Sequence, residues 1–214
     1  RERAEDLART MVALGTEAGV RTVALLTDME TPLGRTAGNA VEVAESVEVL
    51  AGGGPADVVE LTLALAREMV NGAGVDADPA EALASGRAMD VWRSMISAQG
   101  GDPDAALPTA KHTEQVTADR DGVLTRLDAL GVGLAAWRLG AGRARKEDPV
   151  QAAAGVEWHA RPGDAVRAGQ VLFTLHTDEA ERIERAEESL TGAWEIGDRA
   201  AEVSPVVIDR IAAH

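Results

Sequence analysis

Apolar and polar positions near the start of the chain follow first the period of a strand and then that of a helix. The short apolar run at residues 23–26 is typical of a buried strand, and Thr31-Pro32-Leu33-Gly34 after it is a tight turn. A helix is predicted from Asn39, and Glu42 three residues later completes a capping-box pair. Strand, loop and capped helix in this order describe one unit of an α/β fold.

Further helices are predicted on both sides of this unit. Apolar side chains recur at helical spacing over residues 7–14 and again over 58–69, where Pro55 opens the helix. Asp78-Pro79-Ala80-Glu81 has the cap, proline and acid of a helix start, and its apolar stripe continues to Ile96. One strand among several helices is too little for a complete doubly wound sheet. Residues 1–107 are therefore predicted to be the C-terminal part of a larger α/β domain.

The pattern changes near residue 107, where Gly, Pro and Asp cluster. Beyond it, short β-type runs separated by turn signals are predicted at residues 122–124, 132–134, 135–139, 156–159 and 171–176. A final helix is predicted over residues 179–194. We therefore place a domain boundary at residue 107 and expect an α+β, sandwich-like C-terminal domain over residues 108–214.

Composition narrows the function classes. The chain has 214 residues with 21 basic and 36 acidic side chains, a net charge of −15, which argues against binding nucleic acid or an anionic membrane. The absence of cysteine excludes disulfides, thiolate metal sites and a cysteine nucleophile, and it fits a reducing cytoplasm. No apolar run approaches the roughly 18 residues that span a bilayer. The chain opens with Arg1 in helix-like sequence, which we interpret as a cut end.

Most motifs that carry catalytic chemistry elsewhere are weak here. Leu139-Gly-Ala-Gly is followed by Arg143, Arg145 and Lys146, but it lacks the strand and helix context of a phosphate-binding P-loop. A glycine turn with solvated charges is the favoured interpretation. The chain contains no G-x-S-x-G or H-E-x-x-H motif. Its four histidines are scattered without metal-ligand spacing: His112, His159, His176 and His214.

The remaining candidate site consists of Leu33, Thr36 and Glu45. Two backbone carbonyls from the tight loop and one carboxylate from the next helix make an all-oxygen set, which suits a hard cation better than zinc or copper. The alternative is that Glu45 is an ordinary acid on a helix surface.

Several motifs in order carry a family resemblance. They are RTMV-x-LG near the start, TDM-x-x-PLG-x-x-x-GNA-x-EV-x-E, GGGPAD, ISAQGGDP, LGAGR and PGD-x-V. Together they resemble the thymidine and pyrimidine-nucleoside phosphorylase family, over essentially the whole chain. The PGD-x-V hairpin also resembles biotinyl and lipoyl carrier domains, but neither Lys111 nor Lys146 sits at a hairpin tip. Related anthranilate-using glycosyltransferases share the α/β fold but lack a C-terminal domain with this hairpin.

The resemblance implies an enzyme of pyrimidine nucleoside metabolism, with residues 1–107 belonging to its phosphate-binding, catalytic domain. Its reaction is the reversible phosphorolysis of a pyrimidine deoxynucleoside, with phosphate as co-substrate and no covalent cofactor. It also implies a potassium ion at Leu33, Thr36 and Glu45, and a homodimer formed through a helical domain that is missing here.

The same resemblance places the substrate-binding motifs outside these residues. The family's Lys-His-Ser-Thr-Gly-Gly loop and its Arg…Ser…Lys base clamp do not occur in residues 1–214. We therefore assign no catalytic or substrate-binding residue to this chain and expect the 214 residues alone to be inactive. The alternative from another class is a non-catalytic binding or assembly module derived from this family.

Overall fold

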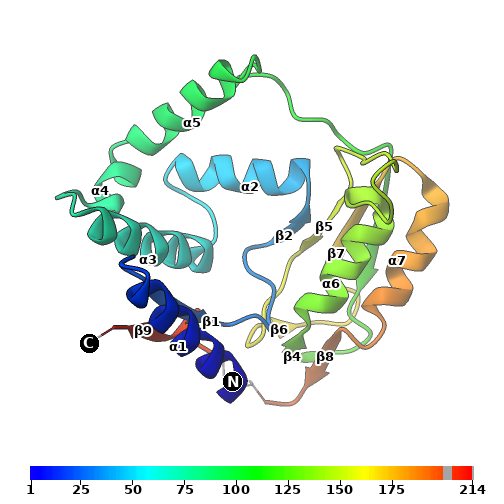
Figure 1. The fold of residues 1–214 in the computed structure, drawn as a ribbon. Helices are drawn as coiled ribbons and strands as arrows, with labels where there is room; N and C mark the ends of the chain where they lie inside the picture. Colours follow the sequence, from blue (N-terminus) through cyan, green and yellow to red (C-terminus); the bar gives the residue numbers. More distant parts are fainter. Residues whose placement is uncertain (200–203, 214) are drawn as a thin grey trace.

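The computed structural model describes residues 1–199 and 204–213. Within these ranges it is a mixed α/β structure with seven α-helices and three small antiparallel sheets. Figure 1 shows two parts, a mainly helical one containing α1 to α5 and a β-rich one that packs around α6 and α7. No helix in the described ranges is both long enough and apolar enough to cross a membrane.

The helical part begins with α1 (Glu2–Glu17) and β1 (Val23–Thr27), and α2 (Ala40–Leu50) and α3 (Ala56–Ala73) follow. Its remaining helices are α4 (Pro79–Ala84) and α5 (Arg87–Ala98). The predicted start at Asp78 is confirmed, since its carboxylate accepts a hydrogen bond from the Ala80 amide at 2.9 Å. The predicted single helix through Ile96 is wrong. It breaks at Gly86, whose φ of 81° lies in the left-handed region that glycine adopts easily.

The chain returns to this helical part at its end. The last strand, β9 (Val207–Ala212), pairs antiparallel with β1, so that Val23 lies opposite Ala212. Arg210 of β9 holds Glu68 of α3 through two hydrogen bonds of 2.7 and 3.0 Å. The boundary at residue 107 stays a prediction, and β9, which follows it in sequence, pairs with a strand that precedes it.

The β-rich part contains two sheets. One has the order β2 (Thr36–Gly38), β5 (Gly155–Trp158), β7 (Val171–Thr177) and β3 (His112–Thr117). The other has the order β6 (Ala165–Val166), β4 (Gly122–Leu127) and β8 (Trp194–Gly197). Strand β2 comes from the loop that precedes α2, so this loop is an edge strand of the β-rich part. The main hydrophobic core lies here and includes Val156, Phe173 and Leu175.

The predicted strands at residues 132–139 are wrong, because these residues are helical. They form α6 (Ala129–Ala136) and a wider, π-type turn, Trp137–Ala141. The Asp128 carboxylate caps α6 by accepting a hydrogen bond from the Gly131 amide at 2.8 Å. Val132, Ala135 and Leu139 are fully buried. A short apolar run of this kind has no period that separates a buried helix from a buried strand.

Two other predictions are corrected in detail. The helix expected over residues 179–194 is shorter, with a 3-10 turn at Ala180–Arg182, α7 at Ile183–Leu190 and β8 beginning at Trp194. The capping box at Asn39 is wrong, because the Asn39 amide group donates to the carbonyls of Ala141 and Gln151 instead. Glu42 accepts a hydrogen bond from the Gly38 amide at 2.6 Å. Tertiary partners therefore replace the expected local cap.

Candidate functional site

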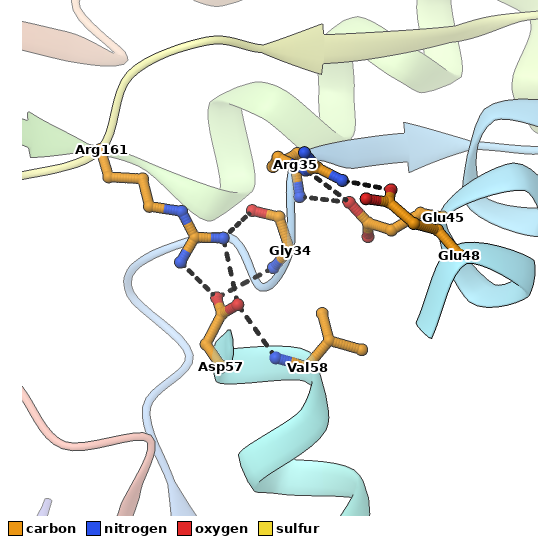
Figure 2. A network of polar contacts seen from close by, with 7 residues as sticks. All are labelled: Gly34, Arg35, Glu45, Glu48, Asp57, Val58 and Arg161. Carbon is orange, nitrogen blue, oxygen red and sulfur yellow. Dashed lines mark hydrogen bonds and ion pairs between the residues drawn. The ribbon is translucent and has the colours of Figure 1, made fainter. Parts of the chain in front are cut away.

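The loop before α2 connects the helical part to the β-rich part. Thr36–Gly38 pairs with β5, and Glu45 of α2 lies against Gly34 and Arg35 on the same loop (Figure 2). Leu33 and Thr36 flank these two residues in sequence. The structure thus brings the helix carboxylate of the predicted cation set against the loop that carries the two predicted carbonyl ligands.

Glu45 is a buried carboxylate, with 9% of its surface exposed. One oxygen, Oε2, accepts a hydrogen bond from the Arg35 amide at 2.7 Å, and Arg35 Nε lies 3.8 Å from the same oxygen. Burial raises the pKa of Glu45, and the Arg35 amide and the nearby Thr36 hydroxyl oppose this shift only in part. The alternative that Glu45 is an ordinary surface acid is therefore wrong.

Gly34 makes room for this carboxylate. Its φ is +80°, and a Cβ added to it would lie 2.3 Å from Glu45 Oε1. A side chain at position 34 would therefore be strained in its backbone and would also displace Glu45. Because Gly34 has no side chain, it leaves a space, here called the Gly34 cradle, in which a Glu45 carboxylate oxygen reaches the loop backbone.

Thr36 carries two oxygens that the fold leaves available. Its hydroxyl is buried and has no hydrogen-bond partner among the described residues, although it lies close enough to Glu45 to favour the charged carboxylate. The Thr36 carbonyl also takes no part in the hydrogen-bond ladder between β2 and β5. The Trp158 amide donates to the Arg35 carbonyl at 2.9 Å, and the Asn39 amide donates to the Ala154 carbonyl at 3.2 Å. Hydrogen-bonded pairs alternate in an antiparallel ladder, so the Thr36 carbonyl is directed away from β5.

The donor set fits a hard monovalent cation. It consists of a buried carboxylate, an unpartnered hydroxyl and backbone carbonyls, all of them oxygens. In residues 1–199 and 204–213 no group of three or more His, Cys, Asp or Glu side chains is arranged to hold a metal ion. Arg35 also pairs with Glu48, so part of its charge is directed away from Glu45.

Two cavities lie beside the loop. The larger one, of about 640 Å³, is lined by Thr36 and Glu45 and, on the sheet side, by Glu157, His159 and His176. The smaller one, of about 130 Å³, is lined by residues that include Leu33, Asp57, Trp158 and Arg161. The larger cavity therefore lies beside Thr36 and Glu45, and the smaller one lies beside Leu33.

Asp57 and Arg161 are functional candidates that the sequence analysis missed. Arg161 Nη1 and Nη2 lie 2.9 and 3.0 Å from the two carboxylate oxygens of Asp57, and Nη2 also donates to the Gly34 carbonyl at 2.6 Å (Figure 2). Asp57 in turn accepts from the Gly34 amide at 3.0 Å and from the Val58 amide at 2.9 Å. Asp57 belongs to the GGGPAD motif and Arg161 directly precedes PGD-x-V, but nothing in either motif indicates that the two side chains meet.

The pKa of Asp57 reflects this environment. Burial by itself would raise the pKa, but hydrogen bonds from Arg161 and from the Gly34 and Val58 amides, together with the guanidinium charge, hold it below the usual aspartate value. Its side chain is 16% exposed, and that of Arg161 is 38% exposed. The pair is therefore partly shielded from water and stays ionised at neutral pH.

Within residues 1–199 and 204–213 the other sequence candidates are not gathered into a metal-binding group. His176 Nε2 lies 3.3 Å from Glu157 but outside hydrogen-bond geometry, and His159 Nε2 lies 2.8 Å from the Thr174 hydroxyl. His112 is exposed on β3, and His214 lies outside the described residues. The cations that follow the glycine turn are exposed: Arg143, Arg145 and Lys146. The prediction that these charges are solvated is confirmed, whereas Gly140 of the same segment is buried.

Known proteins resemble this chain over its length. The sequence profile of the family "Pyrimidine nucleoside phosphorylase C-terminal domain" matches residues 123–197. The chain is 55% identical over 209 residues to a thymidine phosphorylase of Mycobacterium tuberculosis, a match that covers 97% of the chain and 49% of that protein. A pyrimidine-nucleoside phosphorylase of Staphylococcus aureus is 36% identical over 226 residues, covering 98% of the chain and 51% of that protein. The chain spans about half the length of the curated relatives it matches.

Proposed function

Because the chain belongs to the thymidine and pyrimidine-nucleoside phosphorylase family, we propose that it is the C-terminal half of a thymidine phosphorylase. The observation that carries the proposal is the 55% identity to the mycobacterial relative across 97% of the chain. An identity of this level over both the loop region and the β-rich part supports common chemistry in the complete enzyme.

The proposed reaction is a pentosyl transfer. An oxygen of inorganic phosphate bonds to C1′ of the deoxyribose, and the glycosidic bond to the pyrimidine nitrogen breaks. The base leaves with the bonding electrons and takes up a proton, giving thymine and 2-deoxy-α-D-ribose 1-phosphate. Such a reaction requires donors that stabilise charge on the phosphate and on the departing base, in a site that excludes water.

Within this reaction, we propose that Leu33, Thr36 and Glu45 hold a potassium ion in the loop before α2. The support is the buried carboxylate of Glu45, the unpartnered Thr36 hydroxyl and the Gly34 cradle. A bound cation supplies fixed positive charge that favours a nearby anion without any proton transfer. The chain's own part is to present oxygens to that cation from a loop that is anchored on both sides.

The experiment is reconstitution in two halves. Residues 1–214 are assayed for thymine release from thymidine and phosphate, alone and together with the N-terminal half of the Mycobacterium tuberculosis relative. Removing one preorganised donor to a developing charge costs about 10²–10³ in rate, and the motifs for phosphate and base lie outside this chain. We therefore expect no turnover from the chain alone and phosphate-dependent turnover from the combined halves.

Two outcomes would overturn this assignment in different ways. Phosphate-dependent turnover by residues 1–214 alone would place the chemistry in this chain. Halves that assemble, as judged by size-exclusion chromatography with light scattering, but release no thymine would favour the non-catalytic binding or assembly module. The same light-scattering mass tests the proposed homodimer, and uridine in place of thymidine tests the breadth of base acceptance.

A further inference from the structure

Asp57 and Arg161 come from distant segments and meet at one peptide group of the loop. Asp57 lies in the first turn of α3, and Arg161 lies in the turn between β5 and β6, 104 residues away. Both contact Gly34, the residue between Leu33 and Arg35 (Figure 2). Here the pair Asp57–Arg161 is called the Gly34 clamp.

The Asp57 side of the clamp sets the direction of the Leu33 carbonyl. The Leu33 carbonyl and the Gly34 amide belong to one peptide group, and this peptide is trans because the described residues contain no cis bonds. In a trans peptide the N–H and C=O point in opposite directions. Since the Gly34 N–H donates to Asp57 Oδ2 at 3.0 Å, the Leu33 carbonyl points away from Asp57.

The Arg161 side sets the next peptide group. The Gly34 carbonyl accepts from Arg161 Nη2 at 2.6 Å, and the Arg35 amide of the same peptide donates to Glu45 Oε2 at 2.7 Å. The planar peptide group between Gly34 and Arg35 therefore contacts the Arg161 guanidinium through its carbonyl and the Glu45 carboxylate through its amide. A rotation of this plane would move the amide that holds Glu45 in place.

We propose that Asp57 and Arg161 are positioning residues that orient the Leu33 carbonyl and the Glu45 carboxylate for a monovalent cation. The inference rests on the proposed function, in which Leu33, Thr36 and Glu45 bind potassium. Neither residue belongs to the proposed ligand set. The clamp instead holds two successive peptide groups, so that the oxygens need no reorganisation when the ion binds.

The clamp has a matched control on the same helix. Glu68 of α3 is held by Arg210 through two hydrogen bonds of 2.7 and 3.0 Å, which also join α3 to a distant strand. This second pair ties α3 to β9 and does not contact the loop. Breaking it removes an arginine–carboxylate pair of similar geometry and leaves the Gly34 peptide groups untouched.

The test is potassium-dependent thermal stabilisation of residues 1–214. Melting temperatures are measured against potassium chloride, with sodium chloride as the comparison salt and with ionic strength held constant. We expect Asp57→Asn and Arg161→Gln to raise the potassium midpoint about tenfold or more, the usual cost of removing a partner that orients a metal ligand. Glu68→Gln should lower the melting temperature and leave the potassium midpoint at the wild-type value.

A variant that unfolds is replaced by Arg161→Lys, which keeps the charge and loses the forked geometry. Wild-type midpoints in the clamp variants would overturn the proposal, and so would a wild-type chain with no potassium-specific stabilisation. Thymine release by the reconstituted wild-type halves is a separate measurement. Its absence would refute the proposed function, whereas the potassium midpoints decide the clamp.

Discussion

Glu45 and Asp57 are two shielded carboxylates on neighbouring helices, and their surroundings shift their pKa values in opposite directions. Burial dominates at Glu45 and raises its pKa, because the Arg35 amide, the Thr36 hydroxyl and a half-exposed guanidinium offset the lost hydration only in part. At Asp57 a forked guanidinium and two backbone amides outweigh burial and lower the pKa. The hydrogen-bond donors around each buried carboxylate thus decide whether its pKa is raised or lowered.

The lowered pKa of Asp57 predicts an acid-dependent contribution to stability. A carboxylate with a depressed folded-state pKa stabilises the protein above its unfolded value, and this stability is lost as the pH falls through the folded value. We expect Asp57→Asn to lower the free energy of unfolding at pH 7 by about 1–3 kcal/mol. The difference should shrink below the ordinary aspartate value of 3.8.

Urea unfolding of both proteins across this pH range measures the effect. Asp90→Asn, at an exposed position on α5, is the control and should change stability little at any pH. A destabilisation of Asp57→Asn that is equally large at neutral and acid pH would contradict the assigned cause.

A second prediction at the residue scale compares Gly34 with Gly19, which has a similar backbone conformation. Both have φ near +80°, but a Cβ at Gly19 would meet nothing within 4 Å, whereas one at Gly34 would overlap the Glu45 carboxylate. Gly19→Ala should therefore cost about 1 kcal/mol for the left-handed backbone alone. Gly34→Ala should cost clearly more, measured by urea unfolding. Equal losses would mean that Glu45 moves aside freely.

At the scale of elements, the loop before α2 takes its shape from partners that lie elsewhere in the chain. Asp57 and Arg161 hold Gly34, β5 pairs with Thr36–Gly38, and the side chain of Asn39 donates to Ala141 and Gln151. Almost every peptide group of this segment is therefore held from outside. This explains how a short loop can keep several oxygens in fixed directions.

The N-cap of α6 gives a further prediction, for a segment in which the sequence analysis expected strands. Asp128 caps a helix that lies in the main core, and Asp78 caps α4, which has no buried residue. We expect Asp128→Ala to lower the free energy of unfolding by about 1 kcal/mol, within the range for lost N-caps. Asp78→Ala should cost less, because α4 can fray without opening the core. Urea unfolding of the two variants compares them, and a larger loss for Asp78→Ala would contradict this account.

At the scale of the molecule, the two parts are covered unequally. The main hydrophobic core lies in the β-rich part, whereas most of the exposed large apolar side chains belong to the helical part, including Leu7, Leu14, Met69 and Val91. Apolar surface of this extent favours contact with further protein. This contrast agrees with a chain that spans about half the length of its relatives.

Limited proteolysis tests how the two parts are joined. The segment between α5 and β3 has no helix or strand and is largely exposed, so a non-specific protease should cut first between Gly100 and Lys111. The two fragments should then stay together in native buffer, because β1 pairs with β9 and β2 pairs with β5 across the cut. They should separate in denaturant.

Mass spectrometry of the first fragments, with size-exclusion chromatography before and after denaturation, measures both expectations. First cuts inside β4 or β7 would contradict the assignment of the weak segment. Fragments that separate in native buffer would mean that these strand pairings are too weak to hold the parts together.

The sequence by itself determined features that depend on near neighbours. The Asp78 cap and the strands β5 and β7 follow from local hydrogen bonding and side-chain alternation. The ordered motifs also carried the family resemblance. Tertiary structure alone decided whether residues 132–141 form a helix, because nearly all of their side chains are apolar and the sequence has no readable period. The structure buries Val132, Ala135 and Leu139 and leaves Leu134 and Trp137 exposed.

The Gly34 clamp and the pairing of β9 with β1 were also decided only in three dimensions. Arg161 is separated from Gly34 by 127 positions, and no local signal relates residues at such distances. Asn39 illustrates the same limit, since a residue suited to a local cap binds two distant carbonyls instead. Local preferences amount to about 1 kcal/mol or less, so a buried polar group that must find partners overrides them.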